Sequence, residues 1–227
     1  MESEFIDGAS RALVLLSGGL DSAVALYWAI SRAWEVATIE FEYYLRPKRE
    51  RYSCRSLCER AGIRDSIVVP LDFVREVSDL PDEVVVNSAL RRSPEGYIPS
   101  RNLLFYAVAA YYAELGGRQY IVGGHNRTDS ESFPDARKEF FDHLNVLFKL
   151  GMWGHPKVRT QILLPLIEMD KVQVIRLGHS LQVPFELTWS CYHDAEVPCA
   201  TCESCSERRE AFAAAGIESL SDRVIEP

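Results

Sequence analysis

A glycine-rich turn between two apolar segments restricts the fold of this chain more than any other feature. Residues 12–16 read ALVLL, residues 17–22 read SGGLDS, and apolar residues then recur with helical spacing to about residue 33. A short, continuous apolar run is typical of a buried strand in a parallel sheet. The sequence therefore predicts a strand, a tight turn and a helix in succession, with the turn at the carboxyl edge of the sheet.

This turn has the properties of a phosphate-binding loop. Its backbone N–H groups and those of the first helical turn point the same way, and the helix dipole adds to their attraction for an anion. Gly18 and Gly19 let the backbone approach that anion without a Cβ clash. The spacing differs from the Walker and dinucleotide-binding patterns. The alternative is a turn without a ligand, in which Asp21 and Ser22 cap the helix.

The remaining segments alternate between strands and helices. Strands are predicted at residues 35–44, 66–71, 119–124 and 161–167, and helices at 48–61, 100–117, 135–151, 170–183 and 206–216. This alternation predicts an α/β fold with a doubly wound parallel sheet. Residues 75–99 mix charges with prolines, so we expect a long mobile loop in which only residues 83–86 could be ordered.

Composition limits the partners of the chain. Its 227 residues carry 25 basic and 33 acidic side chains, a net charge of −8 that opposes stable, non-specific binding of nucleic acid. No apolar stretch reaches the length of a membrane span, and the first residues lack the basic and apolar regions of a signal peptide. We therefore expect a soluble, cytoplasmic protein with no membrane contact.

Four cysteines near the C-terminus form a candidate metal site. Cys191, Cys199, Cys202 and Cys205 follow the pattern C-x7-C-x2-C-x2-C. Four thiolates satisfy a tetrahedral Zn²⁺ and leave no open position, so we expect a structural zinc site. An iron–sulfur cluster is the alternative, and a disulfide is disfavoured in a reducing compartment.

Three further residues of these chemical types have simpler explanations. His193 lies inside the cysteine array and is expected to be exposed or to face the substrate. Cys54 and Cys58 are four residues apart in a predicted helix and therefore share one face. We expect them to be buried as small apolar side chains with no role in metal binding.

Several short segments relate the chain to a known family. They are LSGGLDS (16–22), NSAL (87–90), IPSRN (98–102), TDSESFPDARKEF (128–140), LGM (150–152), PLIEMDK (165–171) and TWSCY (188–192). With them the chain resembles the 7-cyano-7-deazaguanine synthase (QueC) family of the N-type ATP pyrophosphatases. The resemblance implies a Rossmann-like, ATP-binding α/β domain over residues 1–187, a C-terminal zinc-binding lobe over residues 188–227, and a homodimer.

The resemblance also implies an activity, the ATP-dependent conversion of 7-carboxy-7-deazaguanine and ammonia to 7-cyano-7-deazaguanine. A carboxylate resists attack by ammonia because its carbon is electron-rich and its oxygen leaves poorly, so ATP must first install a leaving group. Ammonia then gives an amide, and a second activation removes the amide oxygen to leave the nitrile. Mg²⁺ bound with ATP stabilises the charge that develops.

The resemblance assigns ATP to the glycine-rich turn. The residues implied to bind ATP are Leu16, Ser17, Gly18, Gly19, Leu20, Asp21, Ser22 and Asn102. Asp21 is implied to position Mg²⁺, since a carboxylate beside phosphate needs a cation between them. Arg101 and Lys171 complete the implied catalytic set by holding phosphate oxygens. The alternatives are a surface charge at a helix start for Arg101 and a solvated helix residue for Lys171.

The deazaguanine is assigned to a second group of residues. They are Asp129, Phe133, Asp135 and Thr188. A carboxylate can accept two hydrogen bonds from the guanidine-like edge of the heterocycle. Asp129 or Asp135 could instead cap a helix. Ser190 is a further candidate for the pocket, and His125 and Arg137 are weaker ones.

Two segments depart from the family pattern. Residues 42–51, EYYLRPKRER, differ where the entry of nucleotide or ammonia could be controlled, and residues 125–129, HNRTD, are not the common version of their loop. The first departure leaves the nucleophile open, so one alternative is transfer of the same carboxylate to another amine, such as a protein. The others are a tRNA-modifying adenylating enzyme and a zinc-stabilised binding module without ATP turnover.

Overall fold

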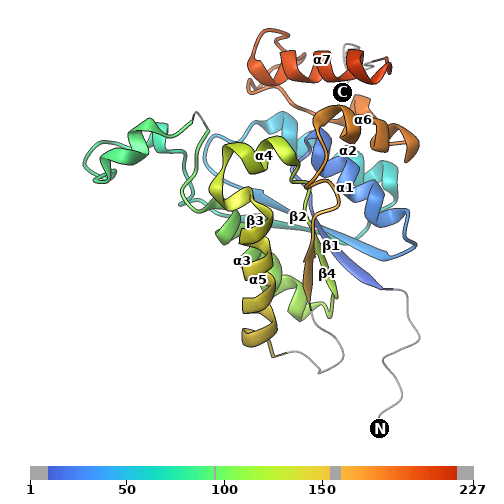
Figure 1. Ribbon diagram of the computed structural model, residues 1–227, viewed down its shortest axis with the longest axis horizontal. Helices are drawn as coiled ribbons and strands as arrows, with labels where there is room; N and C mark the ends of the chain where they lie inside the picture. Colours follow the sequence, from blue (N-terminus) through green and yellow to red (C-terminus); the bar gives the residue numbers. More distant parts are fainter. Residues whose placement is uncertain (1–9, 95, 154–159, 219–227) are drawn as a thin grey trace.

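Five parallel strands form the centre of the computed structural model, which describes residues 10–94, 96–153 and 160–218 (Figure 1). They are β1 (Arg11–Leu15), β2 (Glu35–Glu42), β3 (Ser66–Pro70), β4 (Tyr120–Val122) and β5 (Gln161–Leu163), in the sheet order β3-β2-β1-β4-β5. The strand order therefore reverses between β1 and β4. This confirms the doubly wound sheet, and the loops that leave β1 and β4 diverge to open a crevice at the carboxyl edge.

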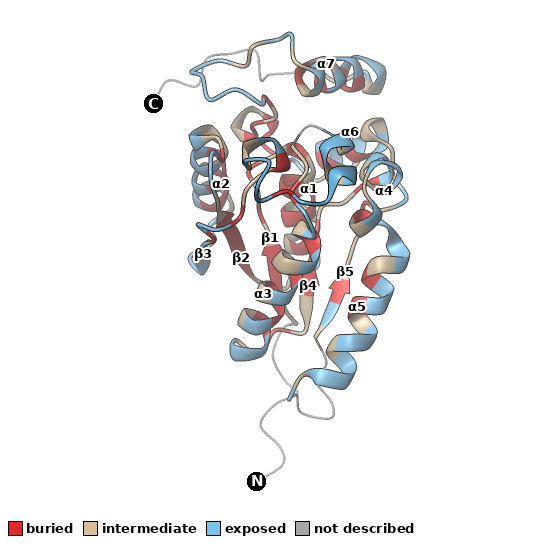
Figure 2. Cartoon of the chain, turned by 90° about the vertical axis from the view of Figure 1, so that its left-hand side faces the viewer, coloured by how far each residue is buried: buried red, intermediate tan, exposed pale blue. Residues whose placement is uncertain are grey.

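Helices cover both faces of the sheet. They are α1 (Leu20–Ile30), α2 (Lys48–Ala61), α3 (Arg101–Leu115), α4 (Arg127–Ser132), α5 (Lys138–Gly151), α6 (Lys171–Ser180) and α7 (Glu203–Ala215). Val14 of β1 packs with buried residues of α1, α2, α6 and α7, whereas its neighbour Leu13 packs with those of α3 and α5. This alternation is the two-residue period of a strand that is buried on both faces. Figure 2 shows the buried residues on the strands and on the sheet-facing sides of the helices.

Several predicted boundaries need correction, and one helix was missed. The strand predicted at residues 161–167 ends at Leu163. The helix predicted from residue 135 is a short 3-10 turn, Pro134–Ala136, followed by extended backbone at Arg137, so that α5 begins at Lys138. Helix α4 was not predicted. It begins at an N-cap, Asn126, whose side chain accepts hydrogen bonds from the N–H groups of Thr128 and Asp129. Helix α7 begins three residues before the predicted start at residue 206.

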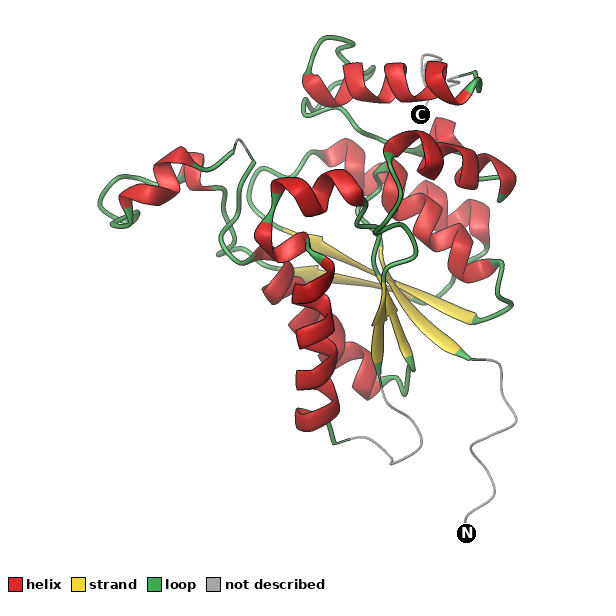
Figure 3. Ribbon diagram, viewed as in Figure 1, coloured by secondary structure: helices red, strands yellow, loops and turns green. Residues whose placement is uncertain are grey.

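The segment at residues 75–99 forms an arm that extends away from the sheet (Figure 3). It contains two short 3-10 turns, Val77–Asp79 and Ser88–Arg92, and no strand among its described residues. Residues 83–86 lie between these turns and are exposed except for Val85, so the regular elements of the segment are the two turns and not residues 83–86. Its mobility stays a prediction.

The C-terminal helix α7 shares the core beside α1 and α6. Phe212 is 1% exposed and meets the ring of Phe185 edge-on, with 5.1 Å between the ring centroids. The buried Arg208 guanidinium donates hydrogen bonds to the Phe185 carbonyl oxygen and the Thr188 hydroxyl, each at 2.8 Å. The division at residue 188 stays a prediction, and residues 219–227 lie outside the described residues. None of the helices in the described ranges is long and apolar enough to cross a membrane.

The packing of α7 on the core leads to a stability prediction. Phe212→Ala removes a fully buried ring and should lower the free energy of unfolding by about 3–5 kcal/mol. Phe73→Ala is the matched control, because Phe73 is 72% exposed, and it should change stability by about 0.5 kcal/mol or less. Urea unfolding monitored by circular dichroism measures both. Equal losses in the two variants would contradict this packing.

Candidate active site and metal centre

The glycine-rich turn closes on itself through its two serines. The Ser22 hydroxyl donates to the Gly19 carbonyl oxygen at 2.9 Å and accepts from the Ser17 N–H at 3.2 Å. Gly19 is the N-cap residue of α1 and no side chain caps the helix, so the first-turn N–H groups stay available to an anion. The capping alternative for Asp21 and Ser22 is therefore wrong. Leu20 contributes only its backbone here, because its side chain is buried in the core.

Other parts of the chain hold this loop in place. Gly18 has φ +88°, and a Cβ added to it would lie 2.3 Å from the carbonyl oxygen of Glu50 in the first turn of α2. The Gly18 carbonyl oxygen accepts a 2.9 Å hydrogen bond from the N–H of Trp189, at the edge of the cysteine cluster. Only glycine combines this conformation with so close an approach. The loop is thus packed between α2 and the C-terminal segment.

Arg46 ties the same loop to the end of β2. Its buried guanidinium donates to the carbonyl oxygens of Ser17 and Phe41, each at 2.9 Å. It also pairs with the carboxylates of Glu40, Glu42 and Glu50, each at 3.1 Å. Arg46 belongs to the EYYLRPKRER departure, and sequence reasoning missed it because its partners come from the phosphate loop, β2 and α2. The departure therefore has a structural role beneath the phosphate loop.

A cavity of about 310 Å³ lies at the crevice between β1 and β4. Residues predicted for the site that line it are Leu16, Ser17, Asp21, Ser22, Arg101, Asn102, Asp129 and Phe133. His125, a weaker candidate, lines it as well, together with Tyr43, Arg46, Glu50 and Tyr106, which were not predicted. In the sequence, a second pair of glycines, Gly123 and Gly124, follows the strand β4 and could have indicated this part of the site. A Cβ on Gly124 would lie 2.8 Å from the backbone of Asp21, so glycine is needed where the two loops meet.

Asp21 and Lys171 form an ion pair next to the phosphate loop. Lys171 Nζ lies 2.6 Å from Asp21 Oδ2, which rules out the solvated alternative for this lysine. Burial opposes the charge of Lys171, but the Asp21 carboxylate raises its pKa above the ordinary value. The other oxygen, Asp21 Oδ1, is buried without a hydrogen-bond partner among the described residues. An unpartnered carboxylate oxygen beside a phosphate loop fits the oxygen ligands that Mg²⁺ requires.

The carboxylates predicted for the deazaguanine are held by backbone N–H groups. Asp129 lines the cavity and accepts from the N–H of Asn126 at 3.0 Å in a capping box. Burial, and then the charge of Asp21, raise the pKa of Asp129. Asp135 accepts from the N–H of Asn102 at 3.0 Å, which fixes the start of α3. Of the described residues predicted for this group, Asp135 and Thr188 lie outside the cavity lining, and their roles stay predictions.

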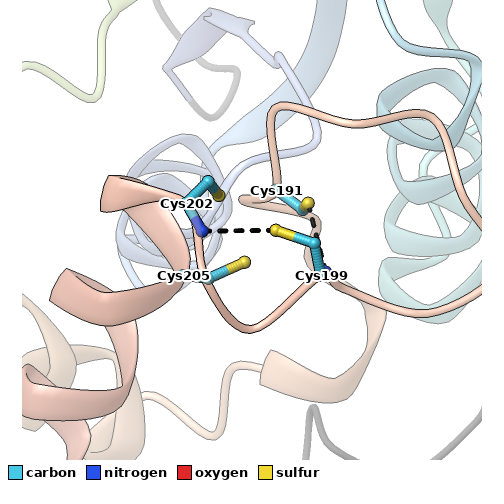
Figure 4. A group of neighbouring side chains, drawn as sticks. All are labelled: Cys191, Cys199, Cys202 and Cys205. Atoms are coloured by element: carbon cyan, nitrogen blue, oxygen red, sulfur yellow. Dashed lines mark hydrogen bonds between the residues drawn. The ribbon is translucent and has the colours of Figure 1, made fainter.

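The four cysteine thiols converge (Figure 4). The Sγ atoms of Cys191, Cys199, Cys202 and Cys205 all lie within 4.8 Å of one another. A single tetrahedral zinc with Zn–S bonds of about 2.3 Å needs thiolates about 4 Å apart. An iron–sulfur cluster distributes its four thiolates over two or four irons and therefore needs a wider set, so the spacing favours zinc.

Backbone N–H groups support the thiolates. The N–H of Cys199 and that of His193 point at Cys191 Sγ, each at 3.4 Å, and the N–H of Cys202 points at Cys199 Sγ at 3.3 Å. The bonds from Thr201 and Cys202 lower the pKa of Cys199 to about 5, which favours the thiolate that a metal binds. His193 is exposed, as expected.

The other two cysteines are not part of this cluster. Cys54 and Cys58 are buried in the core next to α1, as predicted. Cys54 also donates from Sγ to the Leu16 carbonyl oxygen at 3.3 Å, and so it contributes to the support of the phosphate loop.

Comparison with known proteins decides the family. A family model described as "Queuosine biosynthesis protein QueC" matches residues 11–216. The chain belongs to the QueC family. A protein from Thermoplasma acidophilum named 7-cyano-7-deazaguanine synthase is 39% identical over 214 residues, covering 92% of this chain and 90% of its own length. One of the same name from Trichormus variabilis is 36% identical over 217 residues, covering 92% and 96%.

Solved structures agree on the fold of this QueC family member. NMN synthetase from Francisella tularensis matches 95% of this chain and 82% of its own with a TM-score of 0.50 and 18% identity. At that identity the likeness shows a shared architecture, not a shared substrate.

The Arg46 cluster leads to a prediction on stability. Arg46→Met leaves buried carboxylates without their cation and should lower the free energy of unfolding by about 3–5 kcal/mol. Arg51→Met is the matched control, because Arg51 pairs with the same Glu42 from a side chain that is 57% exposed, against 3% for Arg46. Its loss should be about 1 kcal/mol or less in urea unfolding. Similar losses in both variants would refute the role of Arg46.

The cysteine cluster leads to a prediction on metal content. Cys202→Ser removes one of four ligands and should reduce bound zinc from about one ion per chain to a small fraction of that value. Cys58→Ala should keep its zinc, because Cys58 lies in the core and outside the cluster. Elemental analysis of the purified proteins measures both. Full zinc content in Cys202→Ser would exclude the four-thiolate site.

Proposed function

We propose that this chain is an ATP-dependent ligase that converts 7-carboxy-7-deazaguanine and ammonia to 7-cyano-7-deazaguanine. One observation carries the proposal beyond family membership. A single cavity is lined at once by the phosphate loop with Asp21 and by Asp129 and Phe133, the residues suited to a flat heterocycle with hydrogen-bond donors. An enzyme that activates a carboxylate with ATP needs both groups in one cavity.

The reaction consists of two activations at the same carbon. A carboxylate oxygen of the substrate first attacks a phosphorus atom of ATP and breaks its bond to the rest of the nucleotide, which leaves as pyrophosphate from the α-phosphorus or as ADP from the γ-phosphorus. Ammonia then displaces that oxygen together with its adenylyl or phosphoryl group, losing a proton and leaving the amide. The amide oxygen attacks a second ATP in the same way. The C–O bond then breaks, the oxygen leaves with its adenylyl or phosphoryl group, and loss of the two remaining N–H protons gives the nitrile.

The residues of the chain have separate tasks in this scheme. The loop N–H groups and Arg101 would hold phosphate oxygens, and Arg101 enters the cavity at the first residue of α3. Asp21 would hold Mg²⁺, which when bound supplies charge stabilisation at the reacting phosphate. Lys171 pairs with Asp21 at 2.6 Å and so would orient its carboxylate. Asp129 would accept hydrogen bonds from the heterocycle.

The alternative in which the activated carboxylate is transferred to another amine, such as a protein, loses its main support. It was motivated by residues 42–51, and the buried contacts of Arg46 give that stretch a role in holding the loop. The net charge of −8 also disfavours a tRNA substrate. We further propose a cytoplasmic homodimer whose partners are small molecules.

A direct assay tests the function. The purified protein is incubated with 7-carboxy-7-deazaguanine, Mg-ATP and ammonium, and mass spectrometry follows the deazaguanine and the nucleotides. We expect the nitrile, and a loss of about a hundredfold or more in turnover for Asp21→Asn. Asp142→Asn is the control, because Asp142 is half-exposed on α5 and pairs with Lys138.

Two results would contradict the function. ATP consumption with an amide or adenylate as the final product would favour another amine as the acceptor. Full turnover by Asp21→Asn would remove the assigned role of that carboxylate.

A further inference from the structure

Tyr106 places a hydroxyl group without a partner at the cavity. The residue lies in α3, is 0% exposed and lines the cavity. Its Oη has no hydrogen-bond partner among the described residues. A Cβ added to Gly123 would lie 1.7 Å from this oxygen, so the glycine makes room for the hydroxyl at the end of β4.

A buried hydroxyl without a partner is unfavourable for folding. Its hydrogen bonds to water are lost and no protein group replaces them. Phenylalanine would fill the same volume without that cost. Native structures contain few such groups, and each calls for an explanation in terms of function or an unseen ligand.

His125 is the polar neighbour of Tyr106 in the cavity. The two ring centroids are 5.8 Å apart, and His125 packs against Phe141 at 4.9 Å. Burial and the charge of Arg101 lower the pKa of His125 to about 4, so its ring is neutral near pH 7. A neutral imidazole and a phenol each offer one hydrogen-bond donor and at least one acceptor.

This neutral pair differs from the charged groups around it. The charges of Arg101 and Asp21 act on the pKa of His125, and the charge of Asp129 acts on the pKa of Tyr106. All of these residues line the same cavity. The neutral pair therefore shares it with the groups proposed for the phosphates and with the carboxylate proposed for the heterocycle. Carboxylates and phosphates offer only acceptors and suit cations, whereas a carboxamide offers both donors and an acceptor.

We propose that Tyr106 and His125 form a neutral subsite that binds the uncharged carboxamide made midway through the reaction. This proposal rests on the proposed function and deepens it. The charged groups hold the carboxylate for the first activation, and the neutral pair holds the amide in the cavity for the second. A site that binds the amide through paired hydrogen bonds limits its escape before the nitrile forms.

The test uses Tyr106→Phe, which removes one oxygen atom. Isothermal titration measures binding of the 7-carboxamide and of the 7-carboxylate of deazaguanine to the zinc-loaded protein. We expect carboxamide binding to weaken about tenfold, the effect of losing one hydrogen bond in a closed site, and carboxylate binding to change by less than about threefold. The melting temperature should stay equal or rise, because the hydroxyl has no partner in the fold.

Two further variants complete the design. His125→Phe keeps a ring against Phe141 but removes both nitrogens, and it should give the same pattern. Tyr111→Phe is the control, because Tyr111 lies on the same helix and is 59% exposed. This variant should change neither affinity. In turnover from the carboxylate, Tyr106→Phe and His125→Phe should release the amide, which the wild type converts.

The outcomes separate this subsite from the function as a whole. Equal carboxamide affinity in the wild type and Tyr106→Phe overturns the subsite, as does failure of the wild type to bind the carboxamide. A lower melting temperature for Tyr106→Phe with both affinities reduced equally assigns the hydroxyl a structural role and also overturns it. A wild type that makes no nitrile overturns the function, while the titrations still decide whether the pair recognises a carboxamide.

Discussion

The shape of the phosphate loop depends on contacts that come from outside it. Residues 17–19 have small side chains and no apolar surface with which to hold a conformation. Their position is fixed by the Arg46 guanidinium at the Ser17 carbonyl, by the backbone of α2 against Gly18, and by the N–H of Trp189 at the Gly18 carbonyl. Because N–H groups bind an anion only when they already point at it, the function of the site depends on these contacts.

These contacts join the metal centre to the catalytic cavity. Trp189 lies two residues before Cys191 and packs with the cysteine cluster, while its backbone holds Gly18. A second link runs through Arg49 in α2, whose Nε donates to the carbonyl oxygen of Ala195 at 2.9 Å, within the stretch between Cys191 and Cys199. A zinc ion held by the four thiolates would order a segment that supports the phosphate loop.

Much of this fold could be predicted from local sequence patterns, whereas the remaining features depend on contacts between residues that are distant in the sequence. Helix α2 ends where predicted because Gly62 adopts a left-handed conformation, and the cysteine spacing brought four thiols together. The break at Arg137 and the short helix α4 depend on bonds between Asp135 and Asn102 and within the Asn126 capping box. Nothing in the local sequence of Arg46 reveals that its partners lie on β2, the phosphate loop and α2. Apolar periodicity predicts Tyr106 to be a core residue, and it does not indicate that the buried hydroxyl lacks a hydrogen-bond partner among the described residues.

Hydrogen exchange at the phosphate loop tests the central claim, that this loop is the ATP site and is held by the C-terminal segment. Exchange of the peptides covering residues 16–24 and 188–191 is followed by mass spectrometry with and without Mg-ATP, before and after removal of the metal by a chelator. The account predicts slower exchange at residues 16–24 with Mg-ATP, and faster exchange in both peptides once the metal is removed. Exchange at the loop that responds to neither would contradict it.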